Sequence, residues 1–527
     1  MTFDPGHLPY PSRRAPVLAR NCVATSQPLA AQAGLEMLRR GGNAVDAALA
    51  AAIALTVTEP TSNGLGGDAF ALVWDGASLH GLNGSGRSPA AWAPERFAGR
   101  DAMPHLGWDA VSVPGAVDAW ARLSARFGRL EFAALFGPAL AHAREGFPVA
   151  PVTAFHWERA AKRYAAFDEW RRCFLIDGRP PRAGELFRNP ELADSLAAVA
   201  ESRGEAFYHG PLAERLARAA AEDGGALTVD DLAAHRSEWV APLAMDYRGV
   251  TLHELPPNGQ GIAALVALGI LAHLEPERFD PEDPAAVHLQ VEAVRVGLDE
   301  ARRHVADPEH MAIDPRDLLD GERLARRAAA VDPERAADGP LPPCAGGGTV
   351  NLAAADAAGM MVSFIQSNYM GFGSGVVVPG TGISLQNRGA GFTLEAGHPN
   401  RVGGGKRPFH TIIPGFVTEG AAARLAFGLM GGPMQAQGHV QMVLRIFGWG
   451  QNPQAASDAP RWQVMEDGAL ALEPGLAGAA DALRARGHRV RIEERAWLFG
   501  GAQLVHRLDG AYLAASDHRK DGQAVGF

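Results

Sequence analysis

The sequence has little cysteine, no excess of positive charge and no long hydrophobic run. Its three cysteines are widely spaced over 527 residues, so they form neither a metal-binding spacing nor a disulfide framework. The formal net charge of −10 argues against a nucleic-acid groove as the main function. The longest apolar stretch, residues 47–57, is too short for a bilayer span of about 20 residues. We therefore expect no nucleic-acid partner and no membrane span.

The chain also lacks targeting, metal and phosphate-binding signals. Residues 1–16 contain no apolar core of a secretory signal, so we expect a cytoplasmic protein. The run GLGGD at 64–68 lacks the Lys-Ser/Thr ending of a phosphate-binding loop, and no metal ligand set stands out, so we expect no cofactor and no metal. With 47% hydrophobic and 20% charged residues, the composition is typical of a soluble globular protein.

Helix signals dominate the first part of the chain. Ser26 and Pro28 predict a helix start, and Gly41-Gly42 predict its end after Arg40. Asn43 is placed to cap a second, alanine-rich helix over 44–57.

Apolar residues recur at helical spacing over 286–305, which predicts an amphipathic helix. His288, Glu292 and Arg295 fall on its opposite side, spaced to pair with one another. We assign His288 a structural role.

The character of the chain changes at Thr349. Residues 349–356 and 360–368 are predicted to be strands joined by a turn at 357–359, and a helix is expected near 434–447. The residues before this point, 306–348, are rich in proline, aspartate and arginine and indicate a surface connection with short helices.

Thr349 directly follows the glycine run 346–348. Cleavage between Gly348 and Thr349 would leave a free α-amino group beside the threonine hydroxyl, which supplies a base and a nucleophile in one residue. With a pKa of roughly 7.7–8.0, much of that amine is unprotonated near neutral pH. An ordinary glycine-rich loop before a strand explains the same residues, and without other evidence it is the better interpretation.

The chain resembles the γ-glutamyltranspeptidase family of N-terminal nucleophile hydrolases along nearly its whole length. Single motifs are weak, but the order and spacing of the whole set are specific. The similar segments are GGNAVDAALAAAIALTVTEPTSNGLGGDAFALV, SVPGAVDAW, YRGVTLHELPPNGQGIAAL, HLQVEAVRVGLDEARRHVADP, GGGTVN, GFGSG, KRPFHTIIP and GLMGGPMQ.

The resemblance implies a four-layer αββα sandwich, with two stacked sheets between helices. It also implies that the precursor cuts itself into a large fragment, 1–348, and a small fragment, 349–527, which both contribute strands to one domain. By the same resemblance Thr349 is the nucleophile, Ser367 is the second hydroxyl that hydrogen-bonds to it, and the backbone amides of Gly431 and Gly432 hold the oxyanion.

The chain departs from the family in the residues that would bind an amino-acid substrate. The acidic position that holds the donor's α-amino group is Gly391, and the nearby amide position is Arg388. The family's serine pair is replaced by His410 and Thr411, and the asparagine near the second hydroxyl by Tyr369, with Asn368 one place off. The place of the carboxylate-binding arginine is Ser85, with Arg87 two residues further on.

Arg388, Arg87 and His410 instead suit a substrate carboxylate, although Arg388 could equally be a surface or salt-bridge residue. We therefore expect hydrolysis of a small acid amide such as oxamate through an acyl-enzyme, in a branch that includes oxamate amidohydrolase and glutathione-hydrolase-like proenzymes. The alternatives are a glutathione or γ-glutamyl hydrolase or transpeptidase, a glutaryl (cephalosporin) acylase, and an inert binding paralogue. Expected partners are a small-molecule substrate and the two fragments, in a homodimer or heterotetramer.

Overall fold

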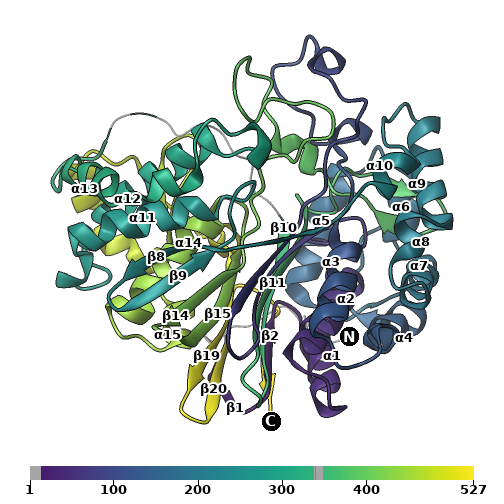
Figure 1. The fold of residues 1–527 in the computed structure, drawn as a ribbon, viewed down its shortest axis with the longest axis horizontal. Helices are drawn as coiled ribbons and strands as arrows, with labels where there is room; N and C mark the ends of the chain where they lie inside the picture. Colours follow the sequence, from purple (N-terminus) through teal and green to yellow (C-terminus); the bar gives the residue numbers. More distant parts are fainter. Residues whose placement is uncertain (1–13, 338, 340–347) are drawn as a thin grey trace.

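Two seven-stranded sheets lie face to face at the centre of the molecule, and helices cover the outer face of each (Figure 1). The computed structural model describes residues 14–337, 339 and 348–527. All strand pairings within the two large sheets are antiparallel. This is the expected four-layer αββα sandwich, and the prediction of the fold class is confirmed.

Both large sheets combine strands from before and after Thr349. The first sheet has the order β1 (Val17–Ala19), β20 (Ala511–Ser516), β19 (Gly501–Leu508), β15 (Ala422–Met430), β14 (Gly415–Glu419), β9 (Val250–Glu254) and β8 (Leu243–Tyr247). The second has the order β21 (Gln523–Gly526), β2 (Cys22–Thr25), β10 (Gly348–Ala355), β11 (Met361–Tyr369), β3 (Asp68–Trp74), β4 (Leu79–Gly84) and β7 (Glu238–Val240).

Three apolar cores hold the layers together. Between the sheets, Phe70, Ile365 and Phe416 belong to one buried cluster. The outer face of the second sheet is covered by α1 (Pro28–Arg39), α2 (Ala44–Thr58) and α3 (Ala116–Phe127), and α4 (Gly137–Glu145) packs on α2. The outer face of the first sheet is covered by α11 (Gly261–Leu274) and α14 (Met434–Val443), and α12 (Pro284–His304) packs on α11 (Figure 1).

Shorter elements surround this frame. The remaining α-helices are α5 (Pro151–Arg163), α6 (Asp168–Phe174), α7 (Pro190–Glu201), α8 (Glu205–Tyr208), α9 (Pro211–Glu222), α10 (Val229–Ala233), α13 (Gly321–Ala329), α15 (Pro453–Asp458) and α16 (Ala480–Ala485). Small strand pairings involve β5 (Phe147–Pro148) and β6 (Leu186–Phe187), β12 (Val377–Val378) and β13 (Ile383–Ser384), and β16 (Trp462–Val464), β17 (Leu470–Leu472) and β18 (Val490–Ile492). In the described part of the chain, no helix combines the length and apolar character that crossing a membrane requires.

The predicted helix starts are largely correct. Asn43 caps α2 through a capping box with Asp46, as expected. The cap of α1 is Gln27 and not Ser26, because the Ser26 hydroxyl instead donates a 2.5 Å hydrogen bond to the buried carboxyl of Glu59. Every residue of α2 is buried, since its many alanines let sheet and helices approach it from all sides.

The side of α12 opposite its apolar stripe is also covered at two positions. His288 and Glu292 are buried, not exposed. The backbone near Asp332 and Ala337 packs over this face, and His488 reaches it from the last part of the chain. Helical spacing alone could not reveal this cover, because it comes from distant segments.

Candidate active site

Thr349 lies in β10 at an irregularity of the ladder between β10 and β11. Gly348 faces Tyr369 and Val350 faces Gln366, so Thr349 alone lies opposite Ser367 and Asn368. Such bulges bend a strand and change the direction of a side chain, and they are common beside active sites. Thr349 is only 2% exposed, yet it lines a cavity of about 760 Å³.

Ser367 joins Thr349 to the peptide bond that precedes it. The Thr349 hydroxyl lies 3.3 Å from Ser367 Oγ, the contact expected from the sequence. The Ser367 hydroxyl donates a 2.7 Å hydrogen bond to the carbonyl oxygen of Gly348 and accepts one of 2.7 Å from the Tyr369 N–H. A serine has one hydroxyl proton, so this arrangement directs it at the Gly348 carbonyl.

Arg388 lies fully buried beside the two hydroxyls. Its Nη2 is 3.3 Å from Ser367 Oγ, and its Nη1 donates a 2.9 Å hydrogen bond to Thr411 Oγ1. Its guanidinium carbon stands 4.3 Å from the ring centroid of Tyr369, a cation–π distance. Tyr369 has a positive φ of 77°, which turns the chain at the end of β11. The structure thus brings together Thr349, Ser367, Tyr369, Arg388 and Thr411.

Asp68 is a member of this group that the sequence analysis missed. It pairs with Ser367 across β3 and β11, and its carboxylate lies 3.0 Å from His410 Nε2. The Ile412 N–H donates to His410 Nδ1, which leaves the ring proton on Nε2 facing Asp68. Burial raises the pKa of Asp68 to about 7, and the charge of Arg388 opposes that rise. Burial, together with Arg388, holds the pKa of His410 well below its usual range. An aspartate at the start of an apolar strand was the available signal.

Gly431 and Gly432 follow the end of β15, and Gly431 lies on the same cavity. Gly431 lines the cavity with Thr349 and has a φ of 117°, while Gly432 has a φ of 62°. The Gln260 side chain donates 2.9 Å and 2.6 Å hydrogen bonds to the carbonyls of Gly432 and Thr411. The Gln260 side chain therefore links the turn at Gly431-Gly432 to Thr411, which accepts a hydrogen bond from Arg388.

Two expected substrate-binding residues are engaged elsewhere. Arg87 bonds Asp307 at 2.7 Å and the Gly405 carbonyl at 3.0 Å, and none of these three is among the described residues that line the Thr349 cavity. Asn368 is close to Thr349 in the ladder, but its amide donates to Ser384 Oγ at 3.1 Å.

The cavity wall is rich in positive charge. Its described lining holds five cations and two carboxylates, which gives an excess of positive charge beside Thr349. The cations are Arg159, Arg163, Arg302, Arg491 and Lys520, and the carboxylates are Glu466 and Asp467. Arg491 and Asp467 pair at 2.5 Å. Arg159 stacks 4.6 Å from the ring of Trp497, which also lines the cavity.

Tyr164 supports the turn that follows β11. It lines the cavity, and its hydroxyl donates a 2.8 Å hydrogen bond to the Met370 carbonyl. Burial raises the pKa of Tyr164 to about 12, so the hydroxyl keeps its proton at neutral pH.

The αββα frame and the hydroxyl pair define an enzyme of the N-terminal nucleophile amidohydrolase class. A family model described as Gamma-glutamyltranspeptidase matches residues 30–527, and the chain belongs to the γ-glutamyltranspeptidase family.

Two curated relatives cover almost the whole chain. It is 35% identical to the glutathione hydrolase-like YwrD proenzyme of Bacillus subtilis, over 96% of this chain and 98% of the relative. It is 36% identical to the oxamate amidohydrolase proenzyme of Klebsiella pneumoniae, over 95% and 97%. Among solved structures, cephalosporin acylase from Bacillus halodurans matches with a TM-score of 0.95 and 46% identity, covering 100% of this chain and 99% of that one.

Proposed function

We propose that the protein is a proenzyme that cuts itself between Gly348 and Thr349 and then uses Thr349 to hydrolyse a small acid amide such as oxamate. The observation that best supports this proposal is a pair of hydrogen-bond distances at Ser367 Oγ, 3.3 Å to the Thr349 hydroxyl and 2.7 Å to the Gly348 carbonyl oxygen. The attacking hydroxyl of Thr349 and the Gly348 carbonyl that it would attack thus both contact Ser367. The two curated relatives are proenzymes, which supports the proposal that this chain is cut.

In self-cleavage, Thr349 Oγ attacks the carbonyl carbon of Gly348. The Ser367 hydroxyl stabilises the negative charge that develops on the carbonyl oxygen. The C–N bond breaks, the Thr349 nitrogen takes up the hydroxyl proton, and Gly348 is left as an ester on Thr349. Water then hydrolyses the ester, which releases the Gly348 carboxylate and leaves Thr349 with a free α-amine.

In turnover, that α-amine accepts the proton of the Thr349 hydroxyl as the oxygen attacks the substrate amide. The amides of Gly431 and Gly432 stabilise the oxyanion, and the leaving amine takes the proton from the α-amine. For oxamate the amine is ammonia. Water then attacks the acyl ester, and oxalate leaves with Thr349 restored.

A short acid amide carries its carboxylate next to the reacting carbonyl, so a cation must lie close to the nucleophile. Arg388 is near enough, since its Nη2 lies 3.3 Å from Ser367 Oγ, although the side chain is fully buried and is not among the described residues that line the Thr349 cavity. A substrate ammonium at the same place would meet a like charge, which is costly in a buried site. This argues against a γ-glutamyl donor, and the oxamate amidohydrolase relative agrees with it.

The size of the cavity favours a second candidate, a glutaryl acylase. A volume of about 760 Å³ is far more than oxamate fills and is within the range of drug-sized ligands. The cations on its wall, such as Arg163 and Lys520, suit a carboxylate further from the reacting carbonyl. The cephalosporin acylase neighbour is consistent with this.

The first test is a denaturing gel of the purified protein. We expect two bands, about two-thirds and one-third of the mass, and N-terminal sequencing of the small band should read TVNLA. Thr349→Ala should remain a single inactive band, and Thr349→Ser, which keeps a hydroxyl, should still be cut. A single band from active protein would refute the proposal.

The second test compares kcat/KM for oxamate, a glutaryl amide and the matching γ-glutamyl amide. Oxamate should be best under the first proposal, and the glutaryl amide under the second. A γ-glutamyl donor that wins by about tenfold, or about 1.4 kcal/mol, would contradict both.

A further inference from the structure

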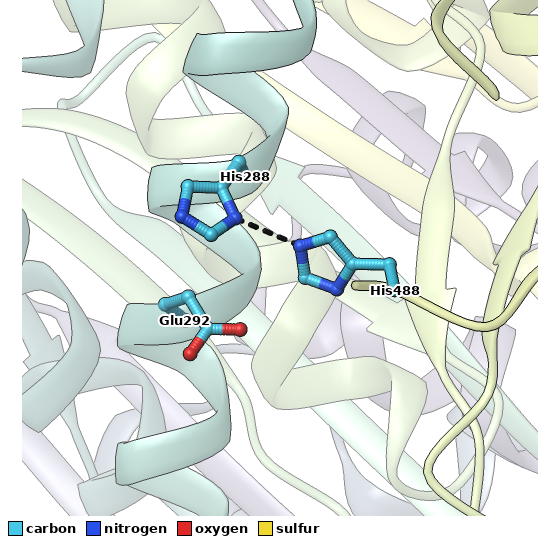
Figure 2. Close-up of side chains that lie close together, drawn as sticks. All are labelled: His288, Glu292 and His488. Atoms are coloured by element: carbon cyan, nitrogen blue, oxygen red, sulfur yellow. Dashed lines mark hydrogen bonds between the residues drawn. The ribbon is translucent and has the colours of Figure 1, made fainter. Parts of the chain in front are cut away.

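A buried cluster of His288, Glu292 and His488 stands apart from the residues of the proposed reaction. His288 and Glu292 project from adjacent turns of α12, and His488 comes from the segment between α16 and β18 (Figure 2). Their exposed fractions are 0%, 4% and 7%. One ligand atom from each lies within 4.8 Å of the other two.

Hydrogen bonds fix how His288 presents its ring. His288 Nε2 lies 2.8 Å from the carbonyl oxygen of Asp332, which can only accept, so Nε2 carries the ring proton. In the neutral ring Nδ1 then carries a lone pair. This atom faces His488 Nε2, which is 2.8 Å away (Figure 2). Imidazoles that bind metals commonly donate their second N–H to a carbonyl in this way.

Glu292 supplies a carboxylate oxygen toward the same place. Its Oε2 accepts a 3.0 Å hydrogen bond from the Ala337 N–H. Its Oε1 is buried and has no hydrogen-bond partner in the described part of the chain, with Arg295 Nε 4.0 Å away. The ion pair with Arg295 is long and supplies no hydrogen bond. A buried carboxylate oxygen without a hydrogen bond is costly, and a cation bound directly to it would reduce that cost.

We propose that His288 Nδ1, His488 Nε2 and a carboxylate oxygen of Glu292 bind a divalent transition-metal ion of the zinc type. Two imidazoles and a carboxylate form a known zinc ligand set, with a fourth position left for water. The two nitrogens need to separate to about 3.3 Å, the spacing of tetrahedral ligands around zinc. No net proton is lost, because His488 moves its proton from Nε2 to Nδ1.

The charge surroundings are compatible with an ion. The nearby arginines also bind other acceptors, although Arg295 Nε forms a long ion pair with Glu292 Oε1. Arg295 Nη2 donates to the carbonyl of Gly339 at 2.6 Å, and Arg486 pairs with Glu334 at 3.4 Å.

The position of the cluster gives the ion a structural role. It would fasten α12 to the segment that contains His488, and the Asp332 and Ala337 contacts would tie in the backbone that leads toward Gly348. In the cut protein proposed above, His288 and Glu292 belong to the large fragment and His488 to the small one. The ion would therefore join the two fragments away from the reacting hydroxyls.

The test is zinc binding by the full-length protein, purified without a polyhistidine tag and stripped with a chelator. Titration with zinc chloride alone should show one tight equivalent and raise Tm by about 3 °C or more. His488→Gln, which keeps a donor toward His288, and Glu292→Gln should each weaken binding at least about tenfold. His310→Gln and Glu309→Gln, at exposed positions, should bind as the wild type does.

Cobalt in place of zinc gives a readout that does not depend on the variants folding. The wild type with one equivalent of cobalt chloride should show the intense visible absorption of a four-coordinate ion with nitrogen and oxygen ligands. Absence of a tight zinc equivalent in the wild type, a six-coordinate cobalt spectrum, or unchanged binding in both cluster variants would each overturn the proposal.

Discussion

The Ser367 hydroxyl donates to the Gly348 carbonyl at 2.7 Å while its oxygen lies 3.3 Å from the Thr349 hydroxyl. One side chain thus contacts both the carbonyl that we propose is attacked and the hydroxyl that attacks it. In the proposed mechanism, departure of Gly348 releases the Ser367 proton, which can then hydrogen-bond to the new N-terminal threonine. The two stages of the proposed reaction therefore share this residue.

Ser367→Ala should slow both self-cleavage and turnover by about 10²-fold, the usual loss for one catalytic donor. Ser367→Thr keeps the hydroxyl and should retain most of both rates. The cut fraction against time on gels gives the first rate, and product release by the matured protein gives the second. Wild-type rates in the alanine variant would remove Ser367 from the mechanism.

Arg388→Lys should lower kcat/KM for oxamate by about 10–100-fold, because lysine cannot reproduce the planar fork that reaches Ser367 and Thr411 together. Self-cleavage should continue, since it uses the chain's own Gly348 carbonyl. Arg203→Lys, at an exposed ion pair with Glu131, is the matched control. Equal losses for substrates with and without a carboxylate would indicate a packing role instead.

Gly431→Ala should lower kcat by about 10²–10³-fold with little change in KM, because a φ of 117° is strained for alanine and the oxyanion amides would shift. Gly450→Ala provides the control. Gly450 also has a positive φ, 66°, but the new methyl would meet open space and lies on a different loop. Similar kinetic losses in both variants would show that the effect is not local to the site.

The pH dependence of the free energy of unfolding should reveal the ionisation of Asp68. Burial raises its pKa from 3.8 to about 7, so between these values the folded chain holds a proton that the unfolded chain has released. Stability from this group is therefore present at low pH and is lost as pH rises toward 7, by at most about 1.4 kcal/mol per pH unit. Asp68→Asn cannot ionise, so urea unfolding should show a shallower decline from pH 5 to 7. A wild-type advantage over the variant that grows with pH would contradict the direction of this shift.

Local signals in the sequence were sufficient for the hairpin of β10 and β11 and for α2. Alternating apolar runs around a glycine turn, and an asparagine before an alanine-rich stretch, act over a few residues. The contact of Thr349 with Ser367 was implied by the resemblance to the family and not by local signals. The hairpin accounts for it physically, because the two residues return to the same end of the ladder.

Contacts between segments far apart in the sequence could not be predicted from such local signals. Asp68 meets His410 across 342 residues, and His288 meets His488 across 200. Arg87 was expected near the substrate because of its place in a motif, whereas its position is set by Asp307, 220 residues away. Sequence spacing carries no information on such pairs until the layers are assembled.

The interleaved strand order has a consequence for how the protein is made. In the second sheet β2 lies beside β10 and β3 beside β11, and in the first sheet β9 lies beside β14, so strands from both sides of Thr349 are neighbours. Before the proposed cut, assembly of these ladders is a reaction within one chain, independent of concentration. After the cut, a denatured molecule must find its other half again, and recovery falls with dilution. We therefore expect the uncut chain to refold more readily at low concentration than the cut protein, because its strands remain covalently joined.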